Sequence, residues 1–303
     1  MTDFTHDVGE RNATIRAENN GENTQPHKFR RKTALMWALI AAITLFIALY
    51  EIFCNGWYAK KTGDTSVSQS LDALITRSLG CAAALLLLRL VGYACFHRPS
   101  RKGLLLSAPC YVTALLNPPI LPLVFGTATL YVVGVGLFYR SLLYFAECFA
   151  VAAFEELLFR GGVFLVFAES RRQKPRGVFF AAIYSSALFA CVHLLNLFVS
   201  SPLAVLLQTG YSFLLGGMCA FVFVVTKNIS FSVALHAIFN FCGGFIERFG
   251  SGSWYTLPII LFTCVLGCLV AIHVLHRFIA FRGSDVDCFY VQPQKQRRES
   301  KKR

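Results

Sequence analysis

The stretch LAVLLQTGYSFLLGGMCAFVFVV at 203–225 carries no charged side chain and is long enough to cross a lipid bilayer as one helix. A helix needs about 20 mainly apolar residues to span the hydrocarbon core of a membrane. Apolar runs of similar length recur along the chain, so the solvent that this sequence fits is the bilayer and not water. We therefore expect a membrane protein built of several spanning helices.

The composition of the whole chain agrees with this expectation. Of the 303 residues, 55% are hydrophobic and only 15% are charged, whereas soluble domains usually carry about 25% charged residues. The net charge of +13 comes largely from short basic runs between apolar blocks, at 28–32, 98–102, 171–176 and 295–303. Such runs are typical of cytoplasmic loops. Because they do not form one folded basic face, we expect no nucleic-acid partner.

The apolar runs predict an all-α, polytopic membrane bundle of about eight transmembrane helices that enclose a polar catalytic cavity. The proline-interrupted third run leaves seven or nine spans as alternatives. The expected spans are 34–54, 71–96, 104–125, 128–150 continuing past 160, 178–199, 203–225, 229–247 and 255–281.

The spans divide the chain into three parts. We expect a disordered cytoplasmic tail at 1–32, a transmembrane domain at 33–283 and a basic cytoplasmic tail at 284–303. With eight spans, the basic connections all fall on the side of the N-terminus, so both chain ends are predicted to be cytoplasmic. The expected location is the cell membrane.

Charged side chains within the fourth span are the first candidates for function. The span ends in AFEELLFRGG, which contains Glu155, Glu156 and Arg160. Charges inside a membrane are costly and usually have a partner or a function. Glu156 and Arg160 are four residues apart on one helix face and can form an ion pair. Glu155 points about 100° away from that pair, so it is expected to meet groups on other helices.

Two later spans supply polar residues at similar depth. LFACVHLLN places Phe189 four residues before His193, and ALHAIFNF places His236 four residues before Asn240. At about 1.5 Å per helical residue, Glu155 and His193 lie roughly 22 and 25 Å from the basic loop at 170–176. The groups can therefore meet well inside the membrane. Alternatively, each histidine taken alone can be explained as a structural residue that forms a hydrogen bond between helices.

Together, FEELLFRG, FACVH and HAIFN resemble the three motifs of the CPBP family, the CAAX-processing and bacteriocin-processing intramembrane endopeptidases. The resemblance covers the chain from Glu155 to Asn240. It implies a helical bundle around a cavity and hydrolysis of peptide bonds within the membrane. It also implies that Glu155 and His193 activate a water molecule, and that His236 and Asn240 hold the oxyanion. Glu156, Arg160 and Phe189 then have supporting roles.

A metal ion is not required by this chemistry. Glu155, His193 and His236 are the residues that would bind zinc if a metal were present, but the HExxH motif is absent. The eleven cysteines include no CxxC pair, so we expect them to pack as small hydrophobic side chains. We therefore favour catalysis without a cofactor and keep zinc as the alternative.

The favoured function is an intramembrane endopeptidase that cuts a membrane-associated protein or peptide, either lipidated or leader-bearing. One alternative is a non-catalytic membrane protein for bacteriocin immunity or scaffolding, which would use the same polar network structurally. A transporter is the other alternative, but the sequence shows no inverted repeat to support it.

Overall fold

A computed structural model describes residues 33–34, 36–38, 40–42, 45, 65–117, 120–131, 134–198, 200–252 and 256–290. The predicted N-terminal tail and most of the predicted first span lie outside the described residues. The predicted basic tail lies outside them beyond residue 290.

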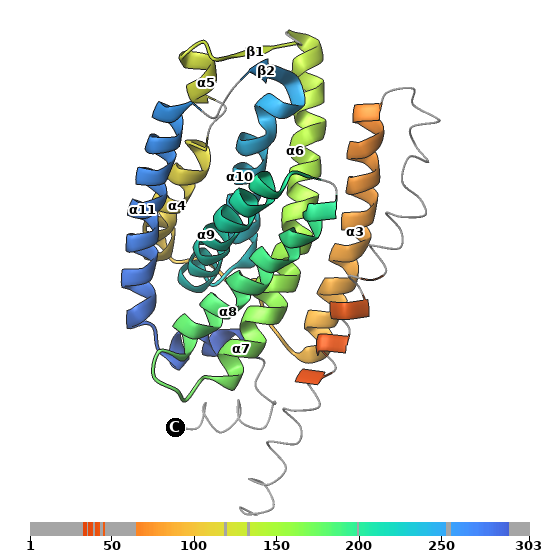
Figure 1. Cartoon of the computed structure of the whole chain (residues 1–303). Helices are drawn as coiled ribbons and strands as arrows, with labels where there is room; N and C mark the ends of the chain where they lie inside the picture. Colours follow the sequence, from red (N-terminus) through yellow and green to blue (C-terminus); the bar gives the residue numbers. More distant parts are fainter. Residues whose placement is uncertain are drawn as a thin grey trace, which may run out of the picture.

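Long helices packed side by side form the body of the protein (Figure 1). The longest are α3 (Thr65–Val91), α6 (Val135–Glu156), α8 (Gly177–Val192), α9 (Pro202–Thr226), α10 (Ile229–Phe249) and α11 (Leu257–Ala280). Five segments, namely Val67–Val91, Gly177–Phe198, Pro202–Thr226, Ile229–Phe249 and Leu257–Ala280, are long and apolar enough to cross a membrane. A helix satisfies its own backbone hydrogen bonds, which lipid cannot do. The predicted polytopic helical bundle is confirmed.

The fourth predicted span begins later than expected. Ala128–Leu130 form strand β1, which pairs antiparallel with strand β2 at Gly250–Gly252, and α6 starts only at Val135. Gly134 precedes the helix with φ +70°, a left-handed conformation that favours glycine. The predicted start of this span at residue 128 is therefore wrong. The helix then continues past residue 160, as predicted, through a π-helical segment η1 (Leu157–Phe164) and α7 (Leu165–Ser170).

The third predicted span, 104–125, is not one helix. It divides into α4 (Arg101–Leu115) and the short α5 (Ile120–Val124). The first helix ends just before Pro118 and Pro119 in the sequence. Proline has no backbone N–H and disfavours helical backbone in the residue before it. The prediction of a single crossing at 104–125 is corrected accordingly.

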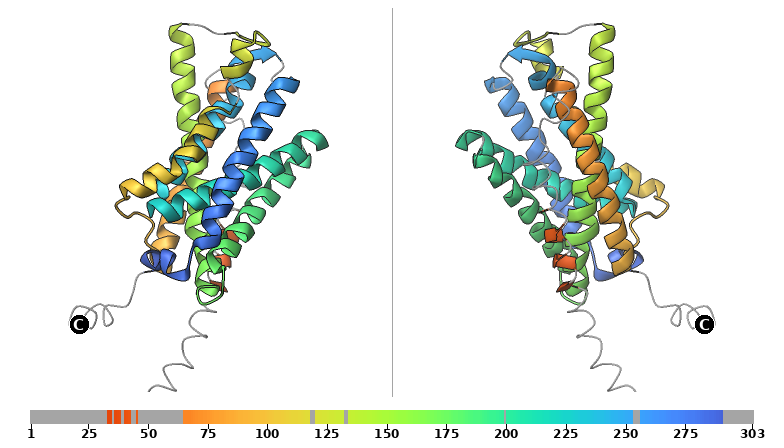
Figure 2. Two further views of the ribbon diagram at one scale, coloured as in Figure 1. Left: turned by 90° about the vertical axis from the view of Figure 1, so that its left-hand side faces the viewer. Right: turned by 90° about the vertical axis from the view of Figure 1, so that its right-hand side faces the viewer.

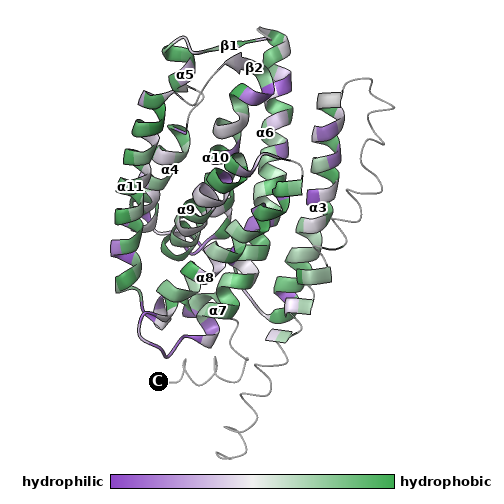
Figure 3. Cartoon of the chain, in the orientation of Figure 1, coloured by the Kyte–Doolittle hydropathy of each residue, from purple (hydrophilic) through white to green (hydrophobic). Residues whose placement is uncertain are grey.

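The polar connections of the bundle gather at one of its ends. The segment after α3 meets the α9–α10 connection, where Asn228 Nδ2 donates to the carbonyl of His97 at 2.8 Å. The α7–α8 connection meets the segment after α11 through an ion pair of Arg172 with Asp287 at 2.5 Å. Figure 3 shows hydrophilic colours in the connections at this end, below long helices that are mostly apolar. The predicted grouping of basic connections on one side agrees with this arrangement, and their cytoplasmic orientation stays a prediction.

The centre of the bundle is the second half of α9. Met218, Cys219, Phe221 and Phe223 are fully buried there. Helices α4, α8 and α10 pack around α9, and α6 packs between α3 and α10. In Figure 2, α8 and α9 run side by side and lean away from the other helices toward their junction. The candidate site therefore lies where α6, α8, α9 and α10 approach one another.

Candidate active site

The two adjacent glutamates at the end of α6 occupy different environments. The Glu156 side chain has an exposed fraction of 0%, whereas that of Glu155 is 24%. Successive helical residues project about 100° apart, so one carboxylate enters the core while its neighbour faces a more open region. This is the difference that the sequence predicted between them.

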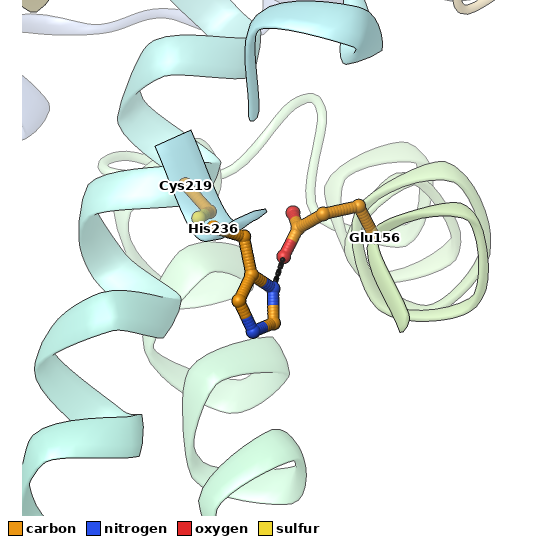
Figure 4. A group of neighbouring side chains, drawn as sticks. All are labelled: Glu156, Cys219 and His236. Carbon is orange, nitrogen blue, oxygen red and sulfur yellow. Dashed lines mark hydrogen bonds and ion pairs between the residues drawn. The ribbon is translucent and has the colours of Figure 1, made fainter. Parts of the chain in front are cut away.

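Glu156 is held by two cationic or polar partners. Its Oε1 atom accepts a hydrogen bond from Arg160 Nη1 at 2.8 Å, and both side chains are fully buried. The predicted Glu156–Arg160 pair is thus present. The same Oε1 atom also lies 2.8 Å from His236 Nδ1 (Figure 4). Glu156 therefore does more than neutralise Arg160, because it also fixes the histidine of α10, a contact that the sequence did not reveal.

His236 lies between the two glutamates. Its Nδ1 atom faces Glu156, and its Nε2 atom lies 3.5 Å from Glu155 Oε2. An ionised carboxylate only accepts hydrogen bonds, so Nδ1 carries a proton and donates it to Glu156 Oε1. Arg160 and His236 thus both engage the buried Glu156 carboxylate, and an uncompensated charge in such a position is costly.

Phe189 forms the wall of the group. Its side chain is 1% exposed, and the Arg160 guanidinium lies over its ring, 4.6 Å from the centroid. The ring also meets the imidazoles of His193 and His236 edge-on, at centroid distances of 5.0 and 5.6 Å. A cation over an aromatic face is stabilised by the ring's negative potential. One phenylalanine therefore positions three of the predicted site residues.

His193 begins a change of helix type. Here α8 ends, and the 3₁₀ segment η2 (His193–Phe198) follows. The His193 Nδ1 atom lies 2.9 Å from the carbonyl oxygen of Phe189. A carbonyl can only accept a hydrogen bond, so Nδ1 carries the proton and Nε2 presents its lone pair. The sequence-predicted role of His193 in holding or activating water requires this tautomer.

Asn240 lies one turn beyond His236 on α10 and is half-buried. Its carbonyl oxygen accepts a hydrogen bond from the Tyr144 hydroxyl at 3.4 Å. Its side-chain amide makes no hydrogen bond to any residue in the described ranges. The amide thus has donors available for a group bound near His236.

The π-helical turn behind the glutamates has a hydrogen-bonding partner of its own. Within η1, the carbonyl of Phe159 accepts a hydrogen bond from the Ser185 hydroxyl of α8 at 2.9 Å. A π-helical segment shifts the backbone pattern and is often found at functional sites. Ser185 is fully buried, and it belongs to none of the three sequence motifs. The bond links the helix of Glu155 and Glu156 to the helix of Phe189 and His193.

A second polar cluster lies on α6 and α10, closer to the strands. The Glu147 Oε2 atom accepts hydrogen bonds from Ser70 at 2.6 Å and from Arg248 Nη2 at 3.1 Å. Arg248 Nη2 also donates to the Ser70 hydroxyl at 2.7 Å. This cluster joins α3, α6 and α10, and its groups satisfy one another.

A comparison with protein families gives a match over the central helices of the bundle. The family model described as type II CAAX prenyl endopeptidase Rce1-like matches residues 138–242. Over this segment, which is about a third of the chain, the sequence is similar to the Rce1-like family. The matched segment runs from α6 to α10 and includes every predicted site residue from Glu155 to Asn240. The resemblance predicted from the three motifs is confirmed at the level of the family.

The family match covers only the middle of the chain. The Rce1-like segment excludes α3, α4 and α11, although α3 and α4 pack against helices of the matched region. No curated protein and no solved structure gives a significant match to the chain.

The donor set can be tested for its fit to a metal ion. Glu156, Cys219 and His236 bring ligand atoms within 4.8 Å of one another (Figure 4). This cluster suits a cation poorly, because Glu156 Oε1 is already shared by Arg160 and His236 and the guanidinium would repel a metal. The set predicted for zinc, with Glu155 and His193 in place of Glu156 and Cys219, does not converge this closely in the described part of the chain. Catalysis without a metal stays a prediction, with zinc as the alternative.

Proposed function

We propose that the protein is an intramembrane endopeptidase that hydrolyses a peptide bond of a membrane-associated polypeptide. The observation that carries this proposal is the contrast between the two glutamates. Glu156 is fully buried and shared by Arg160 and His236, whereas Glu155 is partly exposed and faces His236 Nε2 at 3.5 Å. A purely structural network needs no second, accessible carboxylate at this depth.

The proposed reaction uses four side chains. Glu155 removes a proton from a water molecule that His193 Nε2 helps to orient, and the water oxygen attacks the carbonyl carbon of the substrate. The negative charge that forms on the carbonyl oxygen is stabilised by the Nε2–H of His236 and by the amide of Asn240. Glu155 then delivers the proton to the leaving nitrogen as the carbon–nitrogen bond breaks.

His236 suits the role of donor for a structural reason. Glu156 accepts the Nδ1–H, so the N–H that the proposed reaction requires at Nε2 is directed to the opposite side of the ring. The ring orientation is further limited by the edge-on contact with Phe189. A donor that is fixed before the reaction stabilises developing charge without reorganisation.

We propose that the reaction proceeds without a metal ion. Purified protein is expected to keep its activity in chelator and to contain substoichiometric zinc by elemental analysis. One tightly bound zinc per chain, with activity lost on its removal and restored on its return, would overturn this part of the proposal.

The experiment that tests the function compares the terminal peptides of membrane proteins in cells producing the wild-type chain or its Glu155→Gln variant. New termini in the wild-type sample alone are expected. A farnesylated peptide with a CAAX carboxyl end is the first purified probe, because the matched family is named for that substrate class. Identical termini in both samples, together with equal protection against a bacteriocin, would instead support the non-catalytic immunity alternative.

A further inference from the structure

Two neutral amide side chains pair beside the site. Asn196 of η2 donates from Nδ2 to Gln208 Oε1 of α9 at 2.8 Å, and both side chains are half-buried. Each amide has further hydrogen-bonding capacity. Asn196 Oδ1 and Gln208 Nε2 make no hydrogen bond to other groups in the segments that the structure describes.

The 3₁₀ geometry of η2 places Asn196 on the same side as His193. Side chains three residues apart are aligned in a 3₁₀-helix. The burial pattern follows this period, because His193 and Asn196 are half-buried. The four remaining side chains of η2 are exposed and apolar, as suits a lipid-facing surface, and these are Leu194, Leu195, Leu197 and Phe198. The polar side of η2 therefore faces the protein.

Gln208 lies on the face of α9 that leads to the buried centre of the site. Residues 208, 212, 215 and 219 follow helical spacing along one face. Ser212, Leu215 and Cys219 on this face are all buried, and Cys219 lies within 4.8 Å of the ligand atoms of Glu156 and His236. Gln208 is the half-buried outer residue of this series, at the α8–α9 junction that leans away from the other helices (Figure 2).

We propose that the Asn196–Gln208 amide pair binds the main chain of the substrate in an extended conformation. This inference rests on the proposed peptidase function. Gln208 Nε2 donates to a substrate carbonyl, and Asn196 Oδ1 accepts from a substrate N–H. An extended peptide within the membrane must have such groups satisfied by protein, because lipid offers none.

The spacing sets the position of the contact along the substrate. In a 3₁₀-helix, Asn196 lies about 6 Å along the axis from His193. An extended chain advances about 3.3 Å per residue, so the amide pair contacts the substrate about two residues from the cleaved bond. Because the recognised groups belong to the main chain, the contact requires an unwound segment and not a particular side chain.

The competing explanation is that the pair only joins η2 to α9. Gln208→Glu separates the two roles, since the glutamate keeps the Oε1 acceptor for Asn196 but has no Nε2–H. If the pair has only a structural role, both the melting temperature and the KM of Gln208→Glu should equal the wild-type values. Substrate binding predicts an unchanged melting temperature and a KM for the farnesylated CAAX peptide raised about three- to tenfold, as expected for one lost hydrogen bond.

Thr209→Val is the matched control for Gln208→Glu. Thr209 is the next residue on α9 and is also half-buried. Among the residues that the structure describes, its hydroxyl bonds only within its own helix, to the carbonyl of Val205 at 2.8 Å. Its replacement is expected to leave KM unchanged. An unaltered KM in Gln208→Glu, with wild-type turnover of the probe, would overturn the inference while leaving the peptidase function intact. Absence of turnover by the wild-type chain would instead count against the peptidase function.

A binding measurement keeps the inference testable if Gln208→Glu folds poorly. A photoreactive benzoyl-phenylalanine placed at residue 208 in the Glu155→Gln background should cross-link to the farnesylated peptide. The same group at exposed Leu269 on α11 should not. Equal cross-linking at both positions would also overturn the inference.

Discussion

Helices α6 and α10 carry two polar clusters that differ in how completely their groups satisfy one another. In the cluster of Glu147, Arg248 and Ser70, each polar atom at the centre has a close partner on a neighbouring helix. In the cluster of Glu155, Glu156, Arg160 and His236, one carboxylate is partly exposed and meets its histidine only at 3.5 Å. The first arrangement is that of a structural ion pair, and the second leaves a group able to react.

Burial of charge alone therefore does not identify a functional site in a membrane protein. Both clusters place an acid and a base at depths where isolated charges are costly. The two clusters differ in how well one carboxylate is hydrogen-bonded. Glu147 accepts hydrogen bonds from two donors, whereas the close contact that the structure gives for Glu155 is a ring nitrogen at 3.5 Å. Four sets of variants test this difference between the two clusters.

The largest effect is expected from Glu155→Gln. The amide keeps the shape of the side chain and removes the group that accepts the proton, so turnover should fall by at least about a hundredfold. The melting temperature in detergent should change little, because Glu155 is the partly exposed member of the group. A cleavage assay and a melting curve on the same preparation provide the measurement. An early melting transition would show that Glu155 is structural.

Arg160→Ala should lower both activity and stability. It removes the permanently charged one of the two partners of the fully buried Glu156, and breaking a buried ion pair typically costs about 3–5 kcal/mol. Glu156→Gln is expected to affect both properties as well, because Glu156 also holds His236. Thermal unfolding and cleavage assays again distinguish the outcomes. A stable but inactive Arg160→Ala variant would contradict the supporting, structural role proposed for the Glu156–Arg160 pair.

Glu147→Gln tests the other side of the comparison. Loss of the carboxylate weakens two hydrogen bonds at a site that is about one-fifth exposed, so we expect a loss of about 1–3 kcal/mol in stability. The kcat of the folded fraction should stay within a factor of about two of the wild-type value, well under 1 kcal/mol in activation free energy. A selective loss of kcat without early melting would place Glu147 in the reaction.

The smallest effect on stability is expected at the π-helical turn, where two adjacent serines form a matched pair. Ser185 donates to the carbonyl of Phe159, whereas the equally buried Ser186 hydroxyl has no hydrogen-bond partner in the described structure. Ser185→Ala should cost about 1 kcal/mol and reduce kcat about three- to tenfold by shifting Glu155. Ser185→Thr should restore part of the activity. Equal kcat and stability in Ser185→Ala and Ser186→Ala would show that the Ser185 hydrogen bond does not position Glu155.

The fold class follows from the sequence alone, and so do most of the residues that are proposed for the site. Apolar length fixes which segments can cross a membrane, so α3, α8, α9, α10 and α11 were predictable. The spacing of Glu156 and Arg160 made their ion pair predictable, because partners four residues apart depend only on local helix geometry. Phe189, His193, His236 and Asn240 were found by their motifs.

Only the tertiary structure decided how these residues are shared among helices. The placement of His236 between two glutamates, the bond of Ser185 to η1 and the pairing of Asn196 with Gln208 all join residues from different helices. The division of 104–125 into α4 and α5 and the pairing of β1 with β2 were likewise not predicted. Sequence periodicity specifies which face of a helix is polar, but the partner of that face depends on the rotation and depth of neighbouring helices. These are set by side-chain packing across the whole bundle.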